Sequence, residues 1–99
     1  MRTVDFYLDL AREKRRFTSD LALDRALGLK PGATCSYRIK RSWPSDETII
    51  KIAEIAELDP KEALLDLNIW RAEGNAVLFY QMLKMDYEKL HAPILEAAE

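Results

Sequence analysis

Cysteine and histidine are scarce in this chain, and their scarcity excludes two kinds of site. The 99 residues include one cysteine, Cys35, and one histidine, His91. A disulfide needs two cysteines, and structural metal sites need several cysteine or histidine ligands close together. We therefore expect no disulfide, no metal site and no cofactor.

Long apolar runs are also missing. No stretch approaches the ~20 consecutive apolar residues that cross a bilayer, and the N-terminus lacks the apolar segment of a signal peptide. We therefore expect a cytoplasmic protein with no membrane partner. Because 48% of the residues are hydrophobic, the chain can form one compact domain with a core.

Catalytic patterns are absent as well. Cys35 has no histidine near it in sequence, His91 lies near the C-terminus, and no glycine-rich loop could cradle a phosphate. We therefore expect neither an enzyme nor a small-molecule substrate.

Charge is divided unevenly along the chain. Residues 1–43 hold ten Lys and Arg against five Asp and Glu, or +5, whereas residues 44–99 hold five against twelve, or −7, which together give the net charge of −2. The basic half could bind a polyanion through one face. Alternatively, the run Lys14, Arg15 and Arg16 only ends a helix, where cations complement the negative end of the dipole.

Apolar residues at helical spacing, each series preceded by a capping or breaking residue, predict six helices. Five of the helices are expected to start directly after Thr3, Ser19, Ser45, Asp59 and Asn75. The third helix is expected to start with Pro31 as its first residue. The expected ends lie near Arg15, Gly28, Tyr37, Ala56, Trp70 and Pro93. The fold class is therefore all-α, with residues 1–74 as one domain and residues 75–99 as a C-terminal helix and tail.

The last of these helices is too apolar for a single contact. One stripe carries Phe79, Leu83 and Tyr87, yet further apolar residues such as Met82 lie beside it. A second surface should cover the excess, and a dimer partner is the first candidate. The other interpretation is a helix clasped between helices of its own chain. The residues expected at the dimer interface are Phe79, Met82, Leu83 and Tyr87.

The order helix, Gly28 turn, helix from Ser19 to Tyr37 resembles a helix-turn-helix. With the following Arg38-Ile39-Lys40-Arg41-Ser42 and the Pro-Ser-Asp-Glu-Thr helix start, it is similar to the Cro and lambda-repressor-like family, over roughly Ser19 to Asn68. The segments Leu29–Ala33 and Leu67–Gly74 also look similar to small phage and prophage proteins.

This resemblance implies a five-helix lambda-repressor-like domain, here with an additional C-terminal helix and with the helix-turn-helix at residues 19–38. It implies binding to double-stranded DNA through the major groove as a homodimeric repressor in a bacterial host, at the nucleoid when bound. By position, the groove-facing residues would be Lys30, Pro31, Gly32 and Ser36, with Cys35 beside them. By position, the backbone contacts would be Ser19, Arg38, Lys40 and Arg41.

The chain departs from the family at two positions where its two helices cross. Asp24 stands where the family has a small apolar residue, and Thr34 stands where it has a branched aliphatic one. Because a buried acid without a partner is costly, we expect a hydrogen bond between Asp24 and Thr34.

A further departure concerns base reading. Pro31 and Gly32 replace the Gln, Arg or Asn side chains that engage base edges, so direct readout should be sparse. Specificity would then depend on Lys30, Arg38 and the shape of the DNA. The alternative function is a protein-binding module on the same scaffold, such as a phage-encoded inhibitor of a host protein.

Overall fold

The computed structural model describes residues 2–98, and side chains as far as Leu90. Within that range the chain forms six helices and no strand, as the all-α prediction requires. The helices are α1 (Val4–Arg15), α2 (Asp20–Leu27), α3 (Ala33–Arg38), α4 (Asp46–Ile55), α5 (Pro60–Arg71) and α6 (Asn75–Ala98). No helix in the described part is long and apolar enough to cross a membrane.

Side-chain caps begin four of the helices at the expected residues. Thr3, Ser19 and Ser45 each accept a hydrogen bond of 3.2 Å from the backbone N–H three residues later. Asp59 accepts one of 2.9 Å from the N–H of Lys61. These bonds satisfy amides that have no partner inside the helix, so each cap sets where its helix begins.

Two expected boundaries are wrong. Pro31 was expected to open the third helix, but it lies in the turn, and α3 begins at Ala33. The reason is Gly32, whose φ of 93° lies outside the helical region, so the helix can start only after it. Pro93 was expected to end the last helix, but α6 continues to Ala98, since a proline can kink a helix without ending it.

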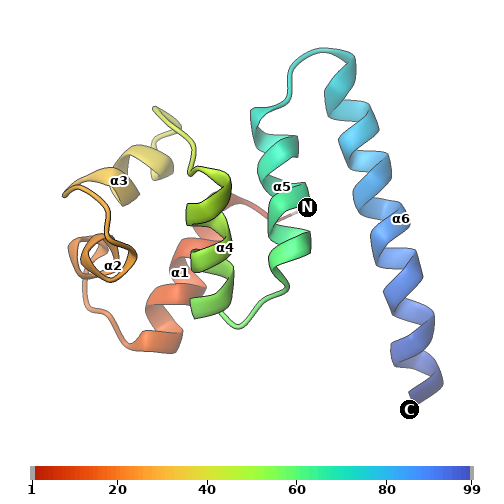
Figure 1. Ribbon diagram of the computed structural model, residues 1–99, viewed down its shortest axis with the longest axis horizontal. Helices are drawn as coiled ribbons and strands as arrows, with labels where there is room; N and C mark the ends of the chain where they lie inside the picture. Colours follow the sequence, from red (N-terminus) through yellow and green to blue (C-terminus); the bar gives the residue numbers. More distant parts are fainter. Residues whose placement is uncertain (1, 99) are drawn as a thin grey trace.

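The first five helices surround one core, and α6 stands outside it. In Figure 1, α4 lies between α5 on one side and α2 and α3 on the other, with α1 behind it. The largest fully buried side chains of the core come from α1, α2, α4 and α5. They are Tyr7, Leu8, Leu23, Ile49, Ile52 and Leu67. The sixth helix packs along α5 and forms one flank of the molecule.

A buried polar network joins α6 to this core. Asp66 of α5 is fully buried and accepts hydrogen bonds from the Tyr7 hydroxyl of α1 and from Lys84 Nζ of α6, the latter at 2.6 Å. Lys84 is itself only 7% exposed. Burial, together with the hydrogen bond to the Asp66 carboxylate, raises the pKa of Tyr7 well above its ordinary value, so the phenol stays protonated and donates.

Removing Lys84 should therefore destabilise the protein through Asp66. In Lys84→Met the carboxylate stays buried with a single donor, and we expect a loss of about 3 kcal/mol in the free energy of unfolding, measured by urea denaturation. The double variant Asp66→Asn/Lys84→Met should recover most of it, because a neutral amide still accepts from Tyr7. Lys51→Met, at an exposed lysine of α4 that forms no ion pair with any described residue, is the matched control. Equal stability of Lys84→Met and the wild type would contradict the assignment.

Candidate nucleic-acid interface

The turn between α2 and α3 is held by one carboxylate. Asp24 is 1% exposed, and its Oδ1 accepts from the Thr34 hydroxyl at 2.5 Å and from the Thr34 N–H at 2.8 Å. Its Oδ2 accepts from the N–H of Gly32 at 2.9 Å. The expected bond between Asp24 and Thr34 is confirmed, and two backbone donors are added to it. The carboxylate therefore binds the backbone at the start of α3 as well as the Thr34 side chain.

Two glycines make the turn possible. Gly28 has a φ of 71° and ends α2, and Gly32 has a φ of 93° just before α3. Both values lie in the left-handed region that residues with a Cβ rarely adopt. The carbonyl of Asp24 also accepts from the N–H of Leu29 at 2.8 Å, which closes the end of α2. Backbone and side chain of the same aspartate therefore define the turn.

The residues expected to face the groove lie together around this turn. Lys30, Pro31, Gly32 and Cys35 are exposed, and Ser36 is half-buried on α3. The chain thus brings these five onto one short segment whose buried side is made by Thr34 and Tyr37. Further exposed residues follow α3, among them Ile39, which is 62% exposed, and Arg41.

Arg38, expected near the DNA backbone, is instead held by three carboxylates. Its guanidinium lies 2.9 Å from Asp20, 3.1 Å from Asp5 and 2.7 Å from Asp9, and its side chain is 22% exposed. Partial burial lowers the pKa of Arg38, but the hydrogen bonds to Asp20 and Asp9 outweigh it and raise the pKa above its ordinary value. The cation therefore links the end of α3 to α1 and to the start of α2.

Lys40 belongs to the same cluster. Its ammonium donates to Asp5 at 3.3 Å and to the backbone carbonyl of Arg38 at 3.1 Å. Arg12 also forms an ion pair with Asp20, at 3.1 Å. Three cations thus meet three carboxylates, and this side of α3 is electrically balanced.

Two other expected contact residues remain accessible. Lys30 and Arg41 are exposed and form no ion pair with any residue that the structure describes. Ser19 is exposed at the N-terminus of α2, where its oxygen caps the helix and its hydroxyl hydrogen remains able to donate. Cys35 is exposed, and its Sγ lies 3.9 Å from Asp20.

The four expected dimer residues differ in how far they are exposed. Phe79, Met82 and Leu83 are each about half exposed or more. Tyr87 turns toward α5, where its hydroxyl donates to Asp59. Tyr87 therefore contributes first to the packing of α6 on its own chain.

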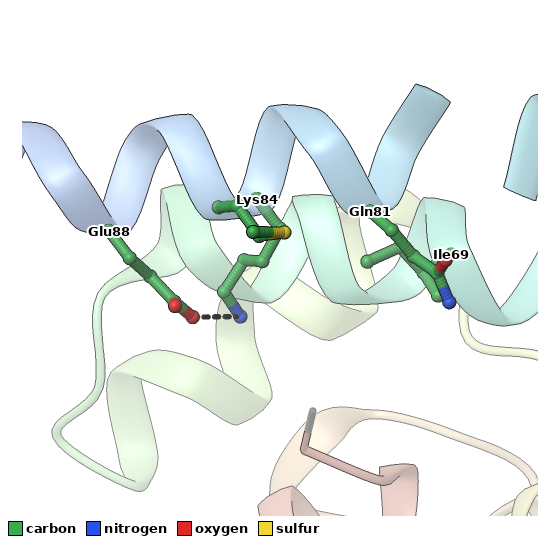
Figure 2. A pocket seen from close by; sticks show the side chains of 5 residues that line it. Ile69, Gln81, Lys84 and Glu88 are labelled. Carbon is green, nitrogen blue, oxygen red and sulfur yellow. Dashed lines mark ion pairs between the residues drawn. The ribbon is translucent and has the colours of Figure 1, made fainter. Parts of the chain in front are cut away.

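The α5–α6 contact is centred on a residue that the apolar pattern leaves out. Lys84 and Glu88, 3.8 Å apart, line a pocket of about 250 Å³ with Ile69 of α5 (Figure 2). Gln81 and Met85 complete its lining. An apolar stripe cannot reveal this contact, because the pattern assigns every lysine to the surface. Asp66, the partner of Lys84, gives no signal either, because its burial is not visible in sequence.

The carboxylates around Arg38 were also missed. Asp5 and Asp9 are four residues apart and therefore share one face of α1, and that spacing was a usable signal. The spacing does not identify the partner, because Arg38 lies about thirty residues further along the chain.

Comparisons with protein-family models, with curated proteins and with solved structures return no match to this chain.

Replacing Asp24 should weaken the attachment of α3 to α2. Asp24→Ala leaves the Thr34 hydroxyl and two backbone amides without their acceptor, so we expect a loss of about 3 kcal/mol in the free energy of unfolding. Asp24→Ala/Thr34→Val removes the orphaned hydroxyl and should recover part of that loss. Thermal unfolding followed by circular dichroism measures both, with the exposed Glu13→Ala as control. A double variant less stable than Asp24→Ala would contradict the hydrogen-bonded pairing.

Proposed function

We propose that the protein is a sequence-specific DNA-binding transcriptional repressor of the phage or prophage type, with residues 1–74 forming a lambda-repressor-like helix-turn-helix domain. The supporting observation is the Asp24 anchor, which holds α3 rigidly on α2 while leaving one side of the segment from Lys30 to Cys35 bare. A helix presented in this way fits the major groove.

In the proposed complex, α3 enters the major groove and its neighbours hold the backbone. Lys30 and Ser36 contact base edges, with Pro31, Gly32 and Cys35 close to the groove floor. Ser19 and Arg41 contact phosphates on either side. Few of these side chains can make bidentate contacts, so DNA shape supplies much of the specificity.

Two copies would bind as a homodimer through α6. Each α3 would then read one half-site, and half-sites in such complexes lie about 34 Å, or one helical turn, apart. Occupancy of an operator that overlaps a promoter would exclude the polymerase and so repress transcription.

The cluster around Arg38 modifies the roles that the resemblance implies. Arg38 and Lys40 are already neutralised by Asp5, Asp9 and Asp20, so a phosphate would have to displace a carboxylate from them. We therefore assign the main electrostatic contacts to Lys30 and Arg41, and a positioning role to Arg38.

A second candidate is a protein-binding module on the same scaffold, such as a phage-encoded inhibitor of a host protein. The balanced charges beside α3 favour it, as does Ile39, which is exposed next to them. An electroneutral surface with an exposed aliphatic residue suits a protein partner better than a polyanion.

Titration with DNA decides between the two. The probe is duplex DNA from the region upstream of the protein's own coding sequence, with a scrambled duplex as control, at several salt concentrations. Tight binding that is lost on the scrambled duplex and weakened by salt supports the repressor. No binding to either duplex at low salt contradicts it and favours the protein-binding module.

The variant Lys30→Ala/Arg41→Ala should bind DNA more weakly. Each lost phosphate or base contact removes a released counterion, so the slope of log K against log salt should fall by about 1 per contact. Lys51→Ala, on α4, removes an exposed cation elsewhere and should leave affinity and slope unchanged. Equal effects of the two variants would show that DNA does not lie against the turn.

Removing carboxylates beside α3 should have the opposite effect. In Asp5→Asn/Asp9→Asn, Arg38 and Lys40 lose two of their acids and their charge becomes available to phosphates. We expect affinity for the same duplex to rise about tenfold at low salt, with a steeper salt dependence. Glu13→Gln on the same helix is the control. A rise no larger than in the control would place the cluster away from DNA.

A further inference from the structure

The side of α6 that points away from α5 is mostly apolar and is exposed. We call it the outer face of α6. It is formed by Leu78, Phe79, Met82, Leu83 and Leu90. Each of these side chains is between 49% and 70% exposed, and together they are five of the nine large exposed hydrophobic residues in the described part of the chain. A concentration of this kind marks an interaction surface, because single exposed hydrophobics are normally scattered.

Helix α6 is longer than α5, the helix on which it packs. α5 has 12 residues and α6 has 24. Tyr87 reaches Asp59, the cap of α5, so the helix beyond Tyr87 extends past the end of α5 (Figure 1). That extension amounts to roughly 16 Å at 1.5 Å per residue. Short unsupported helical segments are marginal in water, and a second helix alongside would stabilise this one.

The charges on the outer face favour a second copy of this chain as the occupant. Residues 75–90 hold Lys84, Asp86, Glu88 and Lys89, so they carry no net charge that would select an acidic or a basic partner. Asp86 and Lys89 are exposed and form no ion pair with any described residue. Both are therefore free to pair between copies.

These two charges also discriminate between orientations. With 100° per residue, Asp86 and Lys89 both lie opposite Lys84, near the middle of the outer face. A parallel pair in register would set each of them against its own kind, which is unfavourable. An antiparallel pair whose two-fold axis passes between Tyr87 and Glu88 would set Asp86 of one copy against Lys89 of the other, twice.

We propose that α6 associates with α6 of a second copy, antiparallel, about a two-fold axis between Tyr87 and Glu88. The inference rests on the homodimer of the proposed function and defines its geometry. The overhanging part of each helix, residues 88–98, lies along residues 77–87 of the other copy, and the Lys84–Asp66 contact within each chain is untouched.

Charge exchange in the full-length chain tests the pairing. Asp86→Lys and Lys89→Asp each create two like-charge contacts and should weaken dimerisation at least tenfold, measured by sedimentation equilibrium at low salt. Asp86→Lys/Lys89→Asp restores opposite charges and should recover most of the wild-type affinity. Glu47→Lys on α4 is the control, and circular dichroism confirms that each variant folds. A double variant as weak as the single ones, or a wild type that stays monomeric at high concentration, overturns the proposal.

Cross-linking tests the orientation. In a Cys35→Ser background, Phe79→Cys would lie beside its own copy in a parallel pair but about 25 Å away in the antiparallel one, at 1.5 Å per residue. We expect no disulfide between Phe79→Cys chains, whereas mixed Asp86→Cys and Lys89→Cys chains should cross-link efficiently. Rapid Phe79→Cys cross-linking overturns the antiparallel arrangement.

Dimerisation and DNA binding are measured separately, so their failures can be told apart. An antiparallel dimer that does not bind DNA supports this inference and contradicts the proposed repressor function. A protein that binds its DNA specifically as a monomer contradicts this inference and leaves the reading helix in place.

Discussion

Asp24 accepts three hydrogen bonds, and the candidate site depends on them. A carboxylate buried to this degree is tolerated only because Thr34 and the amide of Gly32 supply donors. In return it fixes both the position of α3 and the conformation of the turn before it. Apolar packing at the same crossing would hold the helices together, but it would not orient the backbone of Gly32. The turn and the exposed surface beside it are therefore set by hydrogen-bond geometry.

The electrostatic character of this surface comes from pairing between helices. The basic excess in residues 1–43 suggests a positive face, yet Arg38 and Lys40 are matched by acids from α1 and α2. Such ion pairs contribute little where they are exposed and more where they are partly buried, as at Arg38. Their main consequence is that few free cations remain beside α3. Any polyanion bound there would meet Lys30 and Arg41 first.

The C-terminal helix follows a different logic from the rest. Its contact with the body is built around Lys84 and Asp66, a polar pair that specifies one register on α5, because a shift would leave a buried charge alone. Its outer face is apolar and is not used by its own chain. A helix anchored by a specific polar contact on one side and left apolar on the other can hold a partner in a defined direction relative to α3.

Sequence alone determined the helices and the crossing of α2 and α3, because capping and helical periodicity act over a few residues. Thr3, Ser19 and Asp59 cap as expected, and the bond between Asp24 and Thr34 follows from the cost of burying an acid. Tertiary structure alone decided the partners of Arg38 and the pairing of Lys84 with Asp66, since these carboxylates lie 18 or more residues away and only folding brings them together. It also decided which side of α6 remains bare, because that depends on where one buried lysine points.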